Sequence, residues 1–140
     1  MHLEQSIEIA APTSTVWEII TDVARWPEWT PTFKAIEVLD GGSFATGMRA
    51  RITQPAIPKA TWTVTEVRPG EGFVWTTKNL GMSMRADHQI VPTPAGCRVT
   101  LVLDLTGFAA RLLAPVMAPA LRKALRQESA GLKRRAEGAS

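Results

Sequence analysis

The sequence is poor in the residues that catalytic and metal sites most often use. Its 140 residues include one cysteine, Cys97, two histidines, His2 and His88, and no tyrosine. A single cysteine excludes an internal disulfide and a cysteine-based metal cluster. Two histidines cannot form a three-histidine zinc site, and the lack of tyrosine excludes a tyrosine acid or oxyanion donor. Because His2 lies in the terminus, a catalytic pair with an imidazole would have to use His88.

The sequence also lacks a hydrophobic run long enough to span a bilayer. Its longest apolar run, residues 112–121, has ten residues and contains two prolines, whereas a spanning helix needs about 20. The first ten residues carry Glu4 and Glu8 and lack the basic start and apolar run of a secretory signal. We therefore expect a cytoplasmic protein with no stable membrane insertion.

The overall composition is typical of a single globular domain over residues 1–140. Hydrophobic residues make up 45% and charged residues 21% of the chain, which are ordinary values for such a domain. No glycine-rich phosphate loop, zinc finger or RNA-binding motif is present. We expect no cofactor, no metal and no nucleic-acid partner, and make no prediction of the oligomeric state.

Periodicity predicts the order of secondary structure. We expect a strand at 3–9, a helix from 11 to about 23, and a helical turn at 25–29. Six further strands are expected near 33–40, 47–54, 59–68, 72–79, 82–91 and 97–105. The links between these strands are too short for parallel pairing. After Gly107 the pattern predicts a regular helix over about 116–136, with Pro115 and Pro119 in its first turns or at a kink. This order indicates an α+β domain in which one antiparallel sheet wraps around the C-terminal helix.

Several motifs, in this order, resemble the START-like superfamily, also called SRPBCC or polyketide cyclase/dehydrase-like proteins. They are Ile9-Ala10-Ala11-Pro12 with Val16-Trp17, Trp26-Pro27-Glu28-Trp29, Phe73-Val74-Trp75, His88, Gly96-Cys97-Arg98-Val99-Thr100, and Gly107 before an apolar helix start. The resemblance implies a helix-grip fold, with a curved antiparallel sheet of about seven strands around a long C-terminal helix and two short N-terminal helices. It also implies an apolar cavity between sheet and helix that holds a hydrophobic small molecule.

Strand parity predicts which side chains line this cavity. The inward-facing strand residues are expected to be Trp62, Val64, Phe73, Trp75, Met82, Met84, Ala86, His88, Ile90, Val99, Leu101 and Leu103. The remaining predicted ligand-binding residues are Met48, the helix residues Leu113, Met117 and Leu121, and the pair Trp26 and Trp29, which would close one end.

Three polar or reactive residues allow more than one interpretation. His88 could be a core histidine with a satisfied hydrogen bond, a ligand contact or a catalytic base. Glu66 shares the parity of Trp62 and Val64, so it could enter the pocket as an acid or reach solvent at the strand end. Cys97 is expected to face inward and behave as a small hydrophobic residue.

Charge is concentrated in the C-terminal segment. Residues 107–140 carry seven basic and two acidic residues, so this segment is +5 and the remainder is −2. The segment is either the solvated face of a helix or a surface for an anionic membrane or a partner protein.

Two functions are consistent with these observations. The first is binding of a small hydrophobic molecule, such as a polyketide, a lipid or a quinone, without catalysis. The second is a polyketide cyclase or dehydratase in which His88 transfers the proton.

Overall fold

The computed structural model describes residues 1–39, 41, 43–54, 57–79 and 81–138. The predicted turns near 40–42, 55–58 and 79–81 include residues outside this description. The elements are β1 (His2–Ile9), α1 (Thr13–Thr21), η1 (Val23–Glu28), β2 (Ala35–Val38), β3 (Arg49–Gln54), β4 (Ile57–Arg68), β5 (Gly72–Asn79), β6 (Met82–Thr93), β7 (Gly96–Thr106) and α2 (Phe108–Gly138), where η1 is a 3₁₀ helix.

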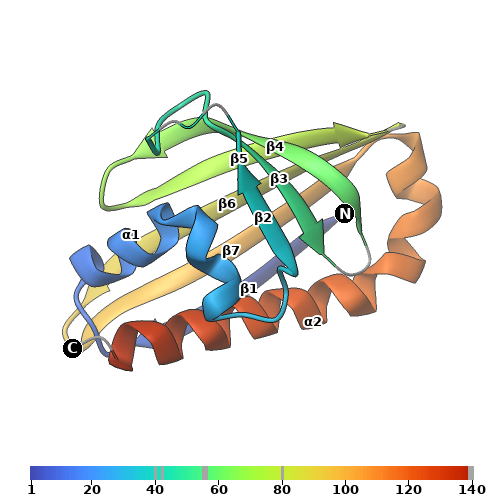
Figure 1. Ribbon diagram of the computed structural model, residues 1–140. Coiled ribbons are helices and arrows are strands. Elements are labelled where there is room, and N and C mark those ends of the chain that lie inside the picture. Colours follow the sequence, from blue (N-terminus) through green and yellow to red (C-terminus); the bar gives the residue numbers. More distant parts are fainter. Residues whose placement is uncertain (40, 42, 55–56, 80, 139–140) are drawn as a thin grey trace.

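All seven strands belong to one antiparallel sheet with the order β1-β7-β6-β5-β4-β3-β2. Strands β2 to β7 pair with their chain neighbours, because the links between them are short. The first strand, β1, pairs with the last strand, β7. The curved sheet lies on one side of α2, and the short helices α1 and η1 lie near one end (Figure 1). The predicted α+β helix-grip fold is confirmed.

The long helix α2 begins earlier than the sequence predicted. It starts at Phe108 and includes both Pro115 and Pro119, whereas the regular helix was expected from about 116. Figure 1 shows that its first turns, in orange, run in a different direction from the remainder. A proline inside a helix removes one backbone hydrogen bond and bends the axis. The two prolines therefore bend α2 without ending it.

None of the described helices is long and apolar enough to cross a membrane.

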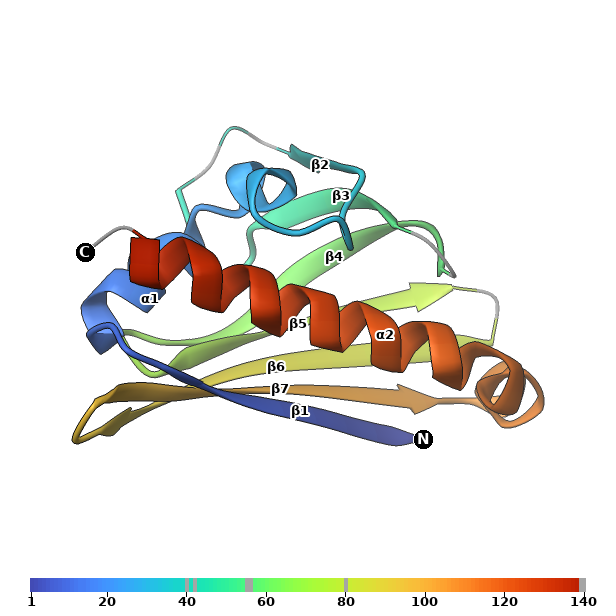
Figure 2. The ribbon, with the colours of Figure 1, turned by 90° about the horizontal axis from the view of Figure 1, so that it is seen from below.

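The straight part of α2 lies along the face of the sheet (Figure 2). Leu121, Glu128, Leu132 and Ala136 are buried on its inner side. Their successive spacings of seven, four and four residues place them on one stripe of the helix. The predicted helical periodicity is thus confirmed for this part of the chain.

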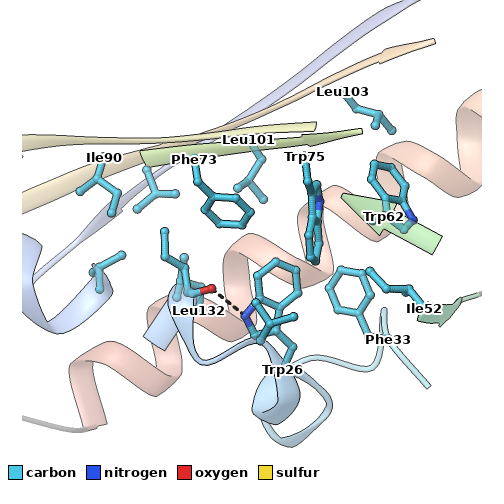
Figure 3. Close-up of a cluster of buried hydrophobic side chains, with 14 of the residues drawn as sticks. Trp26, Phe33, Ile52, Trp62, Phe73, Trp75, Ile90, Leu101, Leu103 and Leu132 are labelled. Atoms are coloured by element: carbon cyan, nitrogen blue, oxygen red, sulfur yellow. Dashed lines mark hydrogen bonds between the residues drawn. The ribbon is translucent and has the colours of Figure 1, made fainter. Parts of the chain in front are cut away.

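Trp26 of η1 is the centre of an aromatic cluster in the core. Its side chain is 1% exposed, and its Nε1 donates a hydrogen bond of 3.1 Å to the carbonyl oxygen of Ile20. Its ring contacts Phe33, Phe73 and Trp75, with centroids 5.0 to 6.3 Å apart. Figure 3 shows Trp26 facing the aromatic side chains of the sheet, with Leu132 of α2 nearby. The short helix predicted at 25–29 therefore supplies a core anchor.

Candidate functional site: a cavity beside His88 and Glu128

A cavity lies between the sheet, the straight part of α2 and the segment after η1. All three structural parts contribute side chains to its wall. The lining residues are Trp26, Thr32, Phe33, Ile52, Gln54, Trp62, Trp75, Ala86, His88, Leu103, Leu121, Ala124, Leu125 and Glu128. The wall is mostly apolar and aromatic, as ligand sites commonly are.

Small residues in the wall leave space for this cavity. Ala86 of β6 pairs with Trp75 of β5 on one side and with Leu103 of β7 on the other. Its methyl group leaves space between the two larger side chains. On the opposite wall, Ala124 of α2 is also small, and its carbonyl oxygen accepts a hydrogen bond of 3.0 Å from Thr32 Oγ1. A hydrogen bond therefore joins α2 to the segment after η1 at this wall of the cavity.

The cavity is small in this conformation. It offers about 50 Å³ of space for the centres of water molecules, enough for a few waters, since one water needs roughly 10–15 Å³ by this measure. Pockets for drug-sized molecules measure about 300–1,000 Å³. Four lining residues, Gln54, Ala86, Ala124 and Leu125, are only half buried. A larger ligand would have to displace side chains, and the half-buried Gln54 and Leu125 are the ones with room to move.

His88 is the buried imidazole of this wall. It lies on β6 opposite Phe73 of β5 and Leu101 of β7, and it is 4% exposed. Its ring stacks on Phe73, with centroids 4.2 Å apart. Its Nδ1 has no hydrogen-bond partner among the described residues. The three interpretations of His88, as a core histidine, a ligand contact or a catalytic base, therefore stay predictions.

Glu128 is a buried residue of the cavity wall that the sequence analysis did not name as a candidate. It lies on α2 and is 6% exposed, and its Oε1 is 3.9 Å from Nε2 of His88. This distance is longer than a hydrogen bond, and it brings a buried carboxyl group next to a buried imidazole. The signal was present in the sequence, because Glu128 occupies the apolar stripe between Ala124 and Leu132. A carboxylate at such a position is seldom buried without a partner.

Trp62 adds a second unpartnered polar group. Its side chain is 3% exposed, and its Nε1 has no hydrogen-bond partner among the residues that the structure describes. A buried indole N–H usually has an acceptor. The cavity wall therefore contains two buried ring nitrogens, on Trp62 and His88, whose hydrogen-bonding capacity the described protein atoms leave unused.

The predicted lining residues fall into three groups. Those that line the cavity are Trp26, Trp62, Trp75, Ala86, His88, Leu103 and Leu121. Those that belong to the core or pack against it without lining the cavity are Trp29, Met48, Val64, Phe73, Met82, Met84, Ile90, Val99, Leu101 and Met117. Leu113 is 48% exposed, so its predicted inward orientation is wrong, because it lies in the part of α2 that the prolines bend away. Whether any of these residues contacts a ligand stays a prediction.

Glu66 points to the outside of the sheet. A β-bulge between Val64 and Glu66 changes the strand parity that Trp62 and Val64 had suggested. Glu66 is exposed and forms an ion pair with Arg68, which also contacts Asp87 at 3.0 Å. The interpretation in which Glu66 reaches solvent is confirmed, and the acid in the pocket is Glu128.

Cys97 faces inward, as predicted. It is fully buried, and burial raises the pKa of its thiol. Among the described residues, no three His, Cys, Asp or Glu side chains come together in a way that could hold a metal ion. The polar side chains that line the cavity are Thr32, Gln54, Trp62, His88 and Glu128.

Solved structures of other proteins share this fold. A protein from Helicobacter pylori has a TM-score of 0.84 at 11% identity, covering 97% of this chain and 88% of its own. A protein from Thermus thermophilus has a TM-score of 0.81 at 18% identity, covering 100% and 99%. The Zhui aromatase/cyclase from Streptomyces sp. has a TM-score of 0.75 at 19% identity, covering 100% and 98%. At these identities the likeness concerns the fold alone.

Sequence comparison identifies the family. A putative polyketide cyclase from Streptomyces cyaneus is 45% identical over 38 residues, which are 27% of this chain and 25% of that protein. The match thus spans about a quarter of that relative's length. The family model described as polyketide cyclase / dehydrase and lipid transport matches residues 1–137. Since this match covers nearly the whole chain, the protein belongs to the polyketide cyclase/dehydrase and lipid transport family.

Proposed function

We propose that the cavity binds a small, flat, hydrophobic molecule that carries at least one oxygen atom. The observation that supports this most directly is a pair of ring nitrogens, on Trp62 and His88, that have no hydrogen-bond partner among the described residues and belong to a mostly apolar and aromatic wall. Such a wall favours a flat molecule, and the indole N–H of Trp62 requires an acceptor. A carbonyl or phenol oxygen supplies that acceptor.

Binding energy and orientation would come from different parts of the wall. Burial of apolar ligand surface contributes about 25 cal/mol per Å² before the costs of association. The polar groups contribute less to affinity but select the orientation, because an unpaired buried donor is costly. Trp62, His88 and Glu128 therefore distinguish an oxygen-bearing ligand from a plain hydrocarbon of the same shape.

The proposal is tested by comparing naphthalene with a naphthol in calorimetric titrations. The wild-type protein should prefer the naphthol. The variant Trp62→Phe keeps an aromatic face but loses the N–H, so we expect the preference to fall by about tenfold, the value of one hydrogen bond. The control Trp17→Phe changes a half-buried tryptophan outside the cavity and should leave the preference unchanged. No binding of either probe, or an unchanged preference in Trp62→Phe, would overturn the proposal.

A second pair of variants tests whether the ligand occupies this cavity. Ala124→Leu places a larger side chain in the wall and should abolish naphthol binding. Ala120→Leu makes the same change at an exposed position of α2, outside the lining, and should have no effect. Equal binding by both variants would place the ligand elsewhere. Native mass spectrometry of the purified protein would show whether a molecule of this class is retained.

The same cavity supports a second candidate function, proton transfer in a cyclase or dehydratase. The observation that favours it is the buried pair of His88 and Glu128, 3.9 Å apart. In such a reaction His88 would take a proton from the carbon next to one carbonyl, and the resulting enolate carbon would attack a second carbonyl carbon of the same molecule. The π bond of that second carbonyl breaks, and its oxygen takes the proton back from the imidazolium to become a hydroxyl group. Glu128 would orient the imidazole and balance its positive charge.

Exchange of carbon-bound hydrogen for deuterium tests this second function without knowledge of the natural substrate. An aryl methyl ketone in heavy water should exchange its methyl protons faster with the wild-type protein than in buffer. His88→Gln should reduce the acceleration by about 10²-fold or more, in line with the contribution of a positioned general base, and Glu128→Gln should reduce it by a smaller factor. If exchange is not accelerated while the naphthol still binds, the protein is a binder without this activity.

A further inference from the structure

We infer that the first turns of α2, residues 108–120, form a docking surface for a membrane that contains anionic lipids. The side chains of Phe108, Leu112, Leu113 and Val116 define this surface, which we call the α2 apolar patch. It lies outside the cavity, and the inference does not rest on the proposed ligand or reaction.

The α2 apolar patch exposes unusually large side chains. Phe108 is 70% exposed, Leu112 73%, Leu113 48% and Val116 78%. Among the other residues that the structure describes, only Met1 and Val91 are large hydrophobics with comparable exposure. A cluster of four such residues on one short segment is a signature of an interaction site.

The exposure follows from the bend of α2. Residues buried on the inner side of the straight part begin at Leu121, whereas only Ala110 is buried between 108 and 120. Phe108, Leu112 and Val116 are spaced by four residues, so they share one side of their own helical segment. The prolines at 115 and 119 therefore present an apolar helix surface to solvent. At one edge of this surface the ring of Phe108 lies beside Gly81, and the ring is still 70% exposed.

Basic residues continue along the same helix. Arg122, Lys123 and Arg126 are exposed and directly follow the apolar segment, and Arg111 is exposed within it. There is no acidic residue between Asp104 and Glu128. Large exposed apolar side chains beside cations match the two signals that hold a peripheral helix on an anionic bilayer, namely shallow apolar insertion and attraction to the headgroups.

The charge pattern favours an anionic membrane over a second copy of this chain. Two copies joined through their α2 apolar patches would bring Arg111 and the 122–126 cations of both chains together. Like charges at such an interface are repulsive. Anionic headgroups would instead neutralise them. We therefore commit to a bilayer as the partner, and dimer formation is one outcome that would contradict it.

The test is co-sedimentation with vesicles of equal parts phosphatidylglycerol and phosphatidylcholine. The wild-type protein should bind these vesicles and should bind pure phosphatidylcholine vesicles at least about tenfold more weakly, because several cations each contribute near the surface. The double variant Leu112→Gln/Val116→Gln should lose at least about tenfold in binding to the mixed vesicles. Arg122→Gln/Lys123→Gln should lose a similar factor, and this effect should shrink at high salt.

The matched control is Val91→Gln, which replaces another large exposed hydrophobic residue, 52% exposed and on β6 near its turn to β7. It should bind vesicles as the wild type does. Circular dichroism of each variant confirms that it folds. Absence of binding by the wild type, equal binding by Leu112→Gln/Val116→Gln, or a dimer that this double variant dissolves would each overturn the inference. Vesicle binding is measured without ligand, so failure of the proposed function would not affect the result.

Discussion

The imidazole of His88 lies parallel to the ring of Phe73, its neighbour across the β5–β6 ladder, with centroids 4.2 Å apart and planes within 6°. Because both nitrogens lie in the ring plane, this stacking determines where they can form bonds. It leaves Nε2 near Glu128 of α2 and Nδ1 without a described partner. A contact between two sheet residues thus orients the polar group of the cavity.

The first prediction is that His88 and Glu128 interact energetically. A double-mutant cycle with His88→Gln and Glu128→Gln should give a coupling of about 0.5–3 kcal/mol in the free energy of unfolding, since both groups are buried and close. Urea denaturation of the four proteins measures it. A cycle that pairs His88→Gln with Glu137→Gln should be additive. Additivity in the first cycle would mean that the two groups act independently.

The second prediction concerns the contact of α2 with the segment after η1. A Cβ at Gly131 would lie 2.1 Å from the carbonyl oxygen of Trp29. Gly131→Ala should therefore lower the free energy of unfolding by about 1–3 kcal/mol, despite the higher helix propensity of alanine.

Gly138→Ala is the matched control for this substitution. A Cβ at Gly138 meets no atom within 4 Å, so this variant should be as stable as the wild type or slightly more stable. Both are measured by urea denaturation. Equal stability of the two alanine variants would show that the helix can shift away from Trp29 at little cost.

The third prediction is a pH dependence that originates at Glu137. Its Oε2 accepts hydrogen bonds from the backbone N–H of Ala10 and from Nζ of Lys133, and these contacts lower the pKa of the carboxyl below its ordinary value of 4.5. The stability that this carboxylate contributes is fully present above pH 4.5 and is lost as the pH falls through the lower folded-state pKa.

The measurement is the free energy of unfolding of the wild type and Glu137→Gln as a function of pH. The wild type should be the more stable protein at neutral pH, and the difference should shrink below about pH 4.5. If the stability difference between the two proteins did not change with pH, Glu137 would not be the origin of the pH dependence.

The fourth prediction is that Cys97 is unreactive in the folded protein. The thiol is fully buried, and burial raises its pKa, so the reactive thiolate is both inaccessible and disfavoured. A chromogenic disulfide reagent should label the native protein far more slowly than the protein in denaturant. Rapid labelling without denaturant would indicate frequent opening of the β1–β7 region.

Much of the fold could be predicted from periodicity and turns. Alternation along 97–105 assigned the two faces of β7, and short links required an antiparallel sheet. The site was predicted less completely. Parity placed Trp62, Trp75 and His88 on the inner side, but Glu128 was counted as one charge of a basic helix. Helix periodicity alone could not show whether the Glu128 carboxylate is buried or whether the apolar stripe is interrupted at this position.

The sequence by itself determined the succession of strands and helices, the antiparallel pairing of consecutive strands and the basic C-terminal helix, because these depend on local periodicity, link length and charge. Tertiary structure alone decided three features. The bulge before Glu66 turned that carboxylate outward, the bend of α2 exposed Leu112 and Val116, and the packing of α2 on the sheet brought Glu128 to His88. Each depends on how distant segments fit together, and local propensity contains no information about that fit.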